Sequence, residues 1–141
     1  MDHLSVEQRS RLMSRVQSKD TDIELALRSS LHLRGLRFRK HVRELAGTPD
    51  VVFPRERIAV FVDGDFWHGY RFPVWQDGLT PFWQQKIRAN RARDRRNFAK
   101  LRRSGWTVIR VWGHEIKRDI EAATLKVAYK VITARSNRLA K

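Results

Sequence analysis

The chain has 141 residues, no cysteine and a formal charge of +15, because 30 Lys and Arg face 15 Asp and Glu. This length suits one domain with one core, and 41% hydrophobic residues with five Trp exclude a disordered basic tail. The absence of cysteine excludes disulfides and thiolate metal sites. The charge favours a polyanionic partner, either DNA or RNA, because neutralised phosphates release counterions.

The domain organisation follows from the composition along the chain. Residues 1–19 are polar and basic, which predicts a short helix or an arm that lies on DNA. Residues 20–135 carry the apolar segments of a single domain, and residues 136–141 are expected to form a frayed tail. No segment approaches the ~20 apolar residues of a membrane span, and the start has no apolar signal region. We therefore expect a cytoplasmic protein with no membrane partner.

A helix is predicted from Thr21 to about Arg34, where an apolar stripe at helical spacing ends before Gly35. Thr21 and Glu24 match a capping box, in which the Glu24 carboxylate reaches back to the amide of the cap residue. Glu24 can also belong to an active site, and the two roles are compatible.

Three short strands follow, and the turns that join them are too short for parallel crossovers, so they predict an antiparallel meander. The first strand alternates apolar and basic residues over 36–42. The second strand begins after Pro49 with Asp50 at its head, and the third is the apolar run 58–62.

The third strand continues into an unusual sequence of acids, aromatics and an imidazole, made of Asp63, Gly64, Asp65, Phe66, Trp67 and His68. Open α/β sheets place their sites at the carboxyl ends of strands. Since Asp50 heads the preceding strand, its carboxylate is expected at the same edge of the sheet. We predict a metal and proton-transfer site at this edge.

A loop with several aromatic residues is expected over 69–80, and a long helix over 81–104 with Thr80 as its cap. Its inward stripe holds Trp83, Ile87, Phe98 and Leu101. Its other faces carry nine positive charges: Lys86, Arg88, Arg91, Arg93, Arg95, Arg96, Lys100, Arg102 and Arg103. A basic face is often only solvated, but this density of charge favours contact with nucleic acid.

Asp94 interrupts the apolar stripe of that helix, and an acid on an inward face needs a partner. A nearby Arg can supply it. His68 can also supply it, and a carboxylate that holds one imidazole nitrogen leaves the other nitrogen free to act as a base. The residues alone leave both partners open.

A strand is expected at 106–112, after a crossover compatible with parallel pairing to the third strand, and a closing helix over 114–134. The fold class is therefore α/β, with a mixed central sheet of a three-strand meander and a later strand, flanked by helices. This is the common architecture of nucleases with the PD-(D/E)xK, restriction-endonuclease-like core. Pro49 and Asp50 supply the first half of that motif, but Val62 and Gly64 stand where its second acid and its Lys are expected.

A more specific resemblance rests on five segments: RSRLMSRVQSKDTDIE, GTPD, DFWHG, FWQQKIRANRARDRR and LRRSGWTVIRVW. Together they resemble the very-short-patch (Vsr) repair endonucleases, which cut DNA beside a T:G mismatch left by deamination of 5-methylcytosine. The resemblance covers roughly residues 8–115, nearly the whole predicted domain.

This resemblance implies the roles of the site residues. Asp50 corresponds to the magnesium-binding aspartate, and Val62 to a position that offers its main-chain carbonyl to the metal. His68 corresponds to the catalytic base, and Asp94 to the acid that supports it. Glu24 corresponds to an acid of the first helix near the site. The expected cofactor is Mg²⁺.

The resemblance also implies how DNA is met. Aromatic side chains would wedge between base pairs at the mismatch, where weak pairing makes wedging least costly. With the basic helix face, the predicted DNA-binding residues are Phe66, Trp67, Trp83, Lys86, Arg88, Arg91 and Arg95. The expected partner is double-stranded DNA with a mismatch, and a monomer is expected because the mismatch is asymmetric.

The chain departs from the resemblance in one respect. Better-known members of the family hold a structural zinc with Cys and His, whereas the matching positions here are Asp65, Tyr70, Phe72 and His114. Because Phe cannot ligate and Tyr is a weak ligand, we expect no zinc. We predict instead that Asp65 and His114 form a salt bridge or hydrogen bond, with Tyr70 and Phe72 packing the gap.

The favoured function is an endonuclease that nicks one strand beside a T:G mismatch by magnesium-dependent phosphodiester hydrolysis. One alternative is a nuclease of the same fold that acts on other DNA, as a restriction or defence enzyme. A non-catalytic nucleic-acid-binding protein is less favoured, because Asp50, His68 and Asp94 occur together. Substrate choice separates the first two alternatives, and substitution of Asp50 or His68 separates both from the third.

Overall fold

The computed structural model describes residues 21–139, so the arm predicted for residues 1–19 and the last two residues of the predicted tail lie outside it. The elements in chain order are α2 (Asp22–Leu33), β1 (Arg39–Lys40), β2 (Val51–Phe53), β3 (Ile58–Asp63), α3 (Phe72–Trp75), the 3₁₀ turn η1 (Gln76–Gly78), α4 (Pro81–Arg103), β4 (Thr107–Trp112), α5 (Gly113–Arg118) and α6 (Ile120–Leu139). None of these helices is both long enough and apolar enough to cross a membrane.

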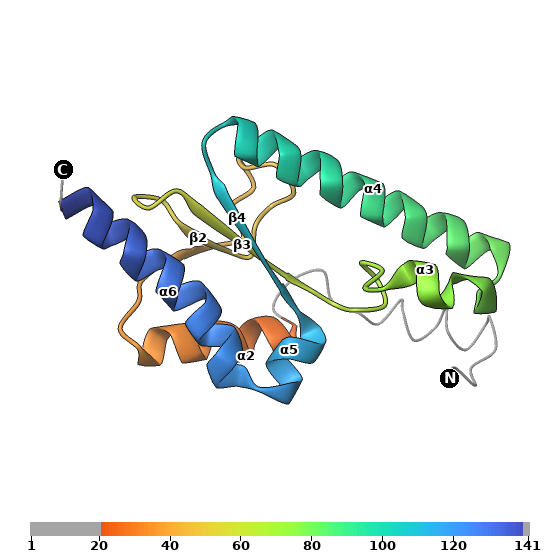
Figure 1. Cartoon of the computed structure of the whole chain (residues 1–141), viewed down its shortest axis with the longest axis horizontal. Coiled ribbons are helices and arrows are strands. Elements are labelled where there is room, and N and C mark those ends of the chain that lie inside the picture. Colours follow the sequence, from red (N-terminus) through yellow and green to blue (C-terminus); the bar gives the residue numbers. More distant parts are fainter. Residues whose placement is uncertain (1–20, 140–141) are drawn as a thin grey trace.

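The four strands form one sheet in the order β1-β2-β3-β4 (Figure 1). The first three strands pair antiparallel, and β4 pairs parallel to β3, with Ile58 opposite Thr107 and Asp63 opposite Trp112. The predicted meander with a later parallel strand is therefore confirmed, and the fold class is α/β with a restriction-endonuclease-like core.

Helices cover both faces of this sheet, with α4 on one side and α2, α5 and α6 on the other (Figure 1). Alternate residues of β3 serve the two faces: Val60 and Val62 pack with α2 and α6, whereas Ala59 and Phe61 pack with α4. All six residues of β3 are buried, because both faces are covered. The same alternation places Asp63, the last residue of β3, on the α4 side.

Three expectations differ from the structure. Strand β1 spans only Arg39–Lys40, which is shorter than the predicted 36–42. The closing helix is two helices, because Asp119 has extended backbone and its side chain accepts a hydrogen bond from the Ala122 amide, as an N-cap of α6 does. Helix α6 then continues to Leu139, so residues 136–139 are helical rather than a frayed tail.

The loop predicted for 69–80 contains α3 and η1, and it is tied to the far end of β4. Asp65 Oδ2 lies 2.9 Å from His114 Nδ1, and Asp65 Oδ1 accepts a 3.3 Å hydrogen bond from the His114 amide. The Tyr70 ring lies 4.4 Å from the His114 ring. The predicted Asp65–His114 contact is confirmed, with Tyr70 packed against it, while Phe72 is buried against Trp75 and α4.

Gly69 is the position where this loop comes closest to α4, and its φ is +73°. A Cβ added there would lie 2.7 Å from the Cδ atom of Arg91 and 2.8 Å from the Cγ2 atom of Ile87. We expect Gly69→Ala to lower the free energy of unfolding by roughly 2–4 kcal/mol, measured by urea titration, because it adds backbone strain to overpacking.

Two glycines serve as controls for this prediction. Gly35 has φ +79° but open space around it, so Gly35→Ala should show the strain alone, about 1 kcal/mol. Gly78 has neither a left-handed φ nor a neighbour within 4 Å, so Gly78→Ala should not destabilise the protein. Equal midpoints for Gly69→Ala and Gly78→Ala would contradict the close approach of the loop to α4.

The Asp65–His114 pair is partly exposed, with 38% and 27% of the two side chains accessible. A pair with this exposure contributes little, because water screens it. In a double-mutant cycle of Asp65→Ala and His114→Ala, we expect a coupling free energy of about 0.5–1 kcal/mol from urea unfolding. Additive effects of the two substitutions would show that the contact does not hold the loop.

Candidate active site

The carboxyl end of β3 opens into a cavity of about 740 Å³. Four elements converge on it: the first turn of α2, the head of β2, the end of β3 and the middle of α4. The structure brings the four predicted catalytic residues together there, because the cavity is lined by Glu24, Asp50, His68 and Asp94. Val62 and Trp67 also line it.

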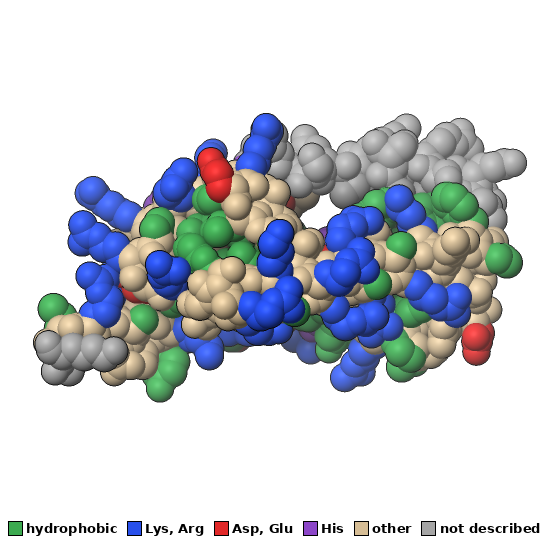
Figure 2. All heavy atoms as spheres, turned by 90° about the horizontal axis from the view of Figure 1, so that it is seen from above, with side chains coloured by type: hydrophobic (Ala, Val, Ile, Leu, Met, Phe, Trp, Pro, Cys, Tyr) green, Lys and Arg blue, Asp and Glu red, His purple; other side chains and the backbone are tan. Residues whose placement is uncertain are grey.

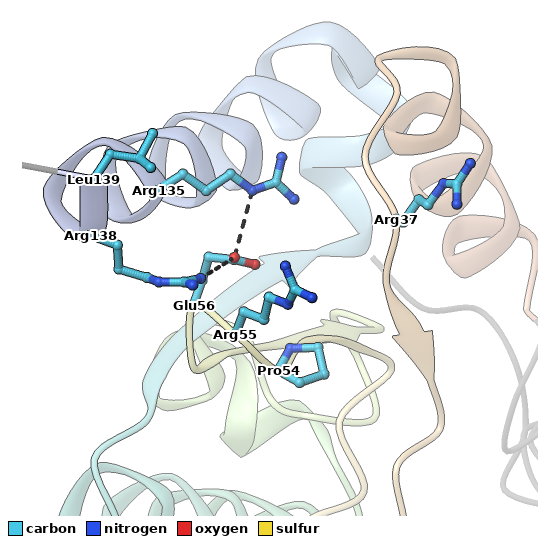
Figure 3. Close-up of a pocket in the computed structure, with 7 residues that line it drawn as sticks. All are labelled: Arg37, Pro54, Arg55, Glu56, Arg135, Arg138 and Leu139. Carbon is cyan, nitrogen blue, oxygen red and sulfur yellow. Dashed lines mark hydrogen bonds and ion pairs between the residues drawn. The ribbon is translucent and has the colours of Figure 1, made fainter.

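A second hollow of about 770 Å³ lies at the opposite end of β3 and is drawn in Figure 3. Its carboxylate belongs to Glu56, which lies 3.6 Å from Arg135 and 3.4 Å from Arg138. No His is among the described residues that line it, which are Arg37, Pro54, Arg55, Glu56, Arg135, Arg138 and Leu139. Of these two cavities, only the first brings His and carboxylate side chains together.

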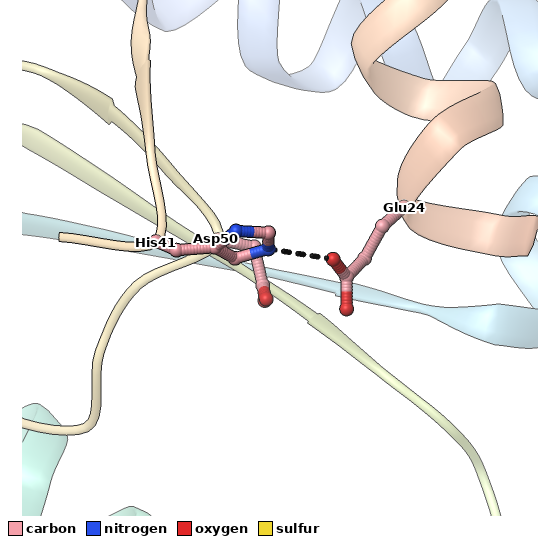
Figure 4. Close-up of side chains that lie close together, drawn as sticks. All are labelled: Glu24, His41 and Asp50. Carbon is pink, nitrogen blue, oxygen red and sulfur yellow. Dashed lines mark hydrogen bonds and ion pairs between the residues drawn. The ribbon is translucent and has the colours of Figure 1, made fainter. Parts of the chain in front are cut away.

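One side of the first cavity holds Glu24, His41 and Asp50, whose side chains converge from α2 and from the segments after β1 and before β2 (Figure 4). Asp50 Oδ2 accepts a 2.7 Å hydrogen bond from the Val62 amide, which fixes its carboxylate against β3. Glu24 Oε2 lies 3.0 Å from His41 Nε2 and 3.2 Å from an Arg28 nitrogen.

Glu24 meets one half of the predicted capping box. The Thr21 hydroxyl accepts a hydrogen bond from the Glu24 amide, so the N-cap of α2 is formed. The Glu24 side chain, which is buried, contacts Arg28 and His41 on the cavity side. The carboxylate therefore lies at the site, and the amide serves the helix.

Burial of the Asp50 carboxyl raises its pKa from 3.8 to about 8, against the lowering effect of the Val62 amide. The negative charges of Glu24 and Asp63 and a hydrogen bond with Glu24 raise it further. Acids that retain a proton in this way are stabilised by a cation placed between them. Carboxylate oxygens at this end of the cavity therefore fit a divalent metal such as Mg²⁺.

The other side of the cavity is built around His68. Its Nδ1 atom lies 2.8 Å from Asp94 Oδ2, and its Nε2 atom lies 3.3 Å from Asp63 Oδ1. Arg110 donates from Nε to Asp63 over 2.7 Å and from Nη2 to Asp94 over 2.6 Å. Asp94 therefore contacts both His68 and an Arg, the two partners that the sequence left open.

Charge is balanced locally on this side. Burial raises the pKa of Asp63, and the positive charges of His68 and Arg110 oppose that rise. Asp63, His68 and Asp94 could geometrically hold a metal. Arg110, however, already places a cation against both Asp63 and Asp94, whereas on the other side Arg28 pairs with Glu24, so Asp50 is the better candidate metal ligand.

Trp83 of α4 packs against the two aromatic residues Phe66 and Trp67, which lie in the loop after β3. Trp83 is only 4% exposed, and its ring lies 5.7 Å from the Phe66 ring and 6.2 Å from the Trp67 ring. Asn90, which is buried, donates a 2.9 Å hydrogen bond to the Trp67 carbonyl. Phe66 and Trp67 are both partly exposed, so they lie outermost and Trp83 supports them.

The basic residues of α4 lie largely at the surface, and Figure 2 shows Lys and Arg side chains spread over this face of the molecule. Lys86, Arg88 and Arg95 are exposed, whereas Arg91 is half-buried. Arg88 donates to the Gln76 side chain over 2.9 Å, and the Lys86 ammonium lies 5.5 Å from the Trp67 ring. The basic face therefore adjoins the aromatic pair.

Three residues to which the sequence assigned no individual role belong to the site: His41 and Asp63 line the cavity, and Arg110 bonds to Asp63 and Asp94. The sequence contained a clue to Arg110, since it is a charged residue inside the apolar strand 106–112. It also contained a clue to Asp63, because the β alternation places this residue on the same face as Phe61. It contained no clue to His41, since the place of His41 beside Glu24 depends on how β1 pairs with β2.

Comparison with known proteins shows which family the chain belongs to. A family model described as DNA mismatch endonuclease Vsr matches residues 1–73. The type II nicking enzyme V.XorIIP of Xanthomonas oryzae pv. oryzae is 49% identical over 117 residues, which cover 82% of this chain and 86% of that enzyme. The type II nicking enzyme V.NmeDIP of Neisseria meningitidis serogroup C is 37% identical over 137 residues, 93% of this chain and 90% of that enzyme.

The DNA mismatch endonuclease Vsr of Escherichia coli K12 is 41% identical over 107 residues, which cover 74% of this chain and 68% of that protein. These similarities confirm the resemblance drawn from the five sequence segments, and they identify a DNA endonuclease. The chain belongs to the Vsr family of DNA mismatch endonucleases.

Proposed function

We propose that this endonuclease nicks one strand of duplex DNA beside a T:G mismatch by magnesium-dependent hydrolysis. The observation that carries the proposal is the 2.8 Å contact of His68 Nδ1 with Asp94 in the cavity that also holds Asp50. The family description names mismatch endonucleases, and several relatives are named nicking enzymes, which supports single-strand cutting.

His68 acts as the general base. An ionised carboxylate can only accept a hydrogen bond, and Asp94 is the closer of the two acids at the ring, 2.8 Å from Nδ1 against 3.3 Å from Asp63 to Nε2. The neutral imidazole therefore carries its proton on Nδ1 and keeps the Nε2 lone pair. Nε2 then takes a proton from the water that attacks phosphorus, as a positioned imidazole does in general base catalysis.

Asp50, the main-chain carbonyl of Val62 and Glu24 would hold the Mg²⁺ ion. When bound, the ion supplies positive charge against the phosphate that is cut. The Val62 amide already fixes the Asp50 carboxylate beside β3, so this chain orients the acid before any ion enters. Burial of Asp50 makes its charge costly, which favours the exchange of its proton for a cation.

Phe66 and Trp67 wedge into the duplex at the mismatch, and Trp83 supports them from beneath. Unstacking a base step is least costly where pairing is already weak, so this arrangement favours mismatched over matched DNA. Lys86, Arg88, Arg91 and Arg95 contact the phosphates of the same duplex. A single domain over residues 20–135 carries all these groups, and a monomer suffices for an asymmetric mismatch.

A second candidate is an endonuclease of this family with a different DNA target, since the shared catalytic residues do not fix substrate choice. The relatives named type II nicking enzymes favour keeping this candidate in view.

The first test is nicking of labelled duplexes in Mg²⁺, with T:G, other mismatches and matched DNA compared. We expect a single cut beside the T of T:G, and a loss of rate of at least about 100-fold in His68→Ala and in Asp50→Asn. Each variant loses one group of the site and keeps the basic face that binds DNA.

The control is Arg34→Met, a substitution of an exposed residue that pairs with Glu121 away from the cavity; it should nick normally. Cutting of matched DNA with equal efficiency would favour the second candidate. Full nicking by His68→Ala would contradict the assignment of the base.

A second prediction concerns pH in metal-free buffer. The pKa of Asp50 is about 8 in the folded state and near its ordinary 3.8 when unfolded, so the folded state keeps a proton that the unfolded state releases between these values. Stability should fall as pH rises from about 4 to about 8 and then level off.

The difference between wild type and Asp50→Asn isolates this effect, because other titrating groups are common to both. We would measure the free energy of unfolding of both proteins by urea titration with chelator at pH 5 and at pH 8. Relative to the wild type, the free energy of unfolding of Asp50→Asn should increase by about a few kcal/mol from pH 5 to pH 8. Parallel pH profiles for the two proteins would contradict the raised pKa of Asp50.

A further inference from the structure

Arg110 is a charged residue in the middle of β4, next to the buried residues Ile109 and Val111. It pairs in register with Phe61 of β3 and faces α4. Its guanidinium lies 4.1 Å from the centre of the Trp112 ring and 5.0 Å from the centre of the Phe98 ring, so it contacts an aromatic residue of its own strand and one of α4. Aromatic stacking of this kind holds a guanidinium plane in a defined orientation.

The orientation directs two donors at two different acids. Nε donates to Asp63 Oδ2 over 2.7 Å, and Nη2 donates to Asp94 Oδ2 over 2.6 Å. The same two acids contact opposite nitrogens of His68, Asp94 at Nδ1 and Asp63 at Nε2. Asp63 and Asp94 are 5% and 13% exposed, so their charges are poorly screened by water.

Two unbalanced carboxylates beside one imidazole would favour the imidazolium, which cannot accept a proton. They would also repel each other and turn away from the ring. One cation that bonds to both acids opposes each effect. Lys could supply the charge, but a single ammonium lacks the planar fork that reaches two acids at fixed angles.

We propose that Arg110 is a positioning residue for the base, which holds Asp63 and Asp94 in place and balances their charge so that His68 Nε2 stays free to accept a proton. The proposal rests on the proposed function of His68. In the reaction, water loses a proton to Nε2 while its oxygen bonds to phosphorus, and the bond from phosphorus to the leaving oxygen breaks with its electron pair on that oxygen. Asp63 Oδ1 then stands where the new Nε2–H can donate to it.

Other charged groups face the same cavity and remain unchanged when Arg110 is replaced. They come from α2, the segment after β1, the head of β2 and α5, and they are Asp22, Glu24, His41, Arg43, Asp50 and Lys117. A shift in the pH profile that follows substitution of Arg110 therefore reports on the Asp63–His68–Asp94 group.

The test is Arg110→Met, which keeps an unbranched side chain against Phe98 and Trp112 but removes the charge and both donors. With the duplex that the wild type nicks, we expect kcat to fall about 100-fold while KM changes less than about threefold. The acid limb of the pH profile of kcat should move up by about one pH unit, because the imidazolium is favoured. For Arg110→Lys, we expect kcat and the acid limb to lie between those of the wild type and Arg110→Met.

The decisive variant is the double substitution Arg110→Met with Asp63→Asn. If Arg110 balances the charge of Asp63, removing that charge should restore kcat about tenfold over Arg110→Met and return the acid limb toward its wild-type position. A merely structural role for Arg110 predicts no such rescue, so absence of rescue together with an unshifted pH profile overturns the proposal. Thermal unfolding of each variant confirms that folded protein is compared.

The proposed function and this inference fail in different ways. Wild-type protein that shows no His68-dependent nicking contradicts the proposed function. Nicking that is lost in His68→Ala but retained at the wild-type kcat in both Arg110→Met and Arg110→Lys contradicts only the role of Arg110. Arg34→Met, which removes a guanidinium paired with Glu121 far from His68, should match the wild type in both kcat and pH profile.

Discussion

Burial of several carboxylates at the carboxyl end of one strand is the constraint on which the site depends. Glu24 and Asp63 are buried, and Asp50 and Asp94 lie beside them in the same cavity. Charges in such a place are stable only with partners of opposite sign or with retained protons. Arg110 provides the partner on the His68 side, and the proton retained by Asp50 marks where a metal ion is proposed on the other. The ion pairs of Arg110 and the protonated Asp50 lie on opposite sides of the end of β3.

Helix α4 joins the core, the proposed catalytic group and the proposed DNA surface in one element. Its stripe of Ile87, Phe98 and Leu101 packs inward, while Asp94 on the same side reaches His68. Asn90 holds the Trp67 carbonyl, and the exposed turns carry the basic side chains. A shift of this helix along the sheet would therefore displace His68 and the aromatic pair together. In the proposed function, this coupling would link a phosphate contact on the outer face to the geometry of His68 within.

Sequence patterns located much of this arrangement, because alternation and helical spacing are local. Asp94 stood out as an acid inside an apolar stripe, and Asp50 as an acid at the head of a strand. The bridge made by Arg110 could not be read in the same way, since it needs the register of β3 against β4, a pairing of distant segments. The break at Asp119 was missed because one capping side chain ends one helix and begins another within an otherwise helical pattern.

The segment with Phe66 and Trp67 is held by contacts at both of its ends. On one side Asp65 bonds to His114 at the end of β4, and on the other His68 bonds to Asp94 of α4. Further along, Tyr70 offers its carbonyl to the Trp75 indole over 2.8 Å. The Asp65–His114 pair alone contributes little, because both side chains are partly exposed. Since the remaining anchors are the His68–Asp94 contact and buried packing, Phe66 and Trp67 are positioned mainly by the same interactions that orient His68. In the proposed function, recognition of the duplex and activation of the base would therefore share one structural support.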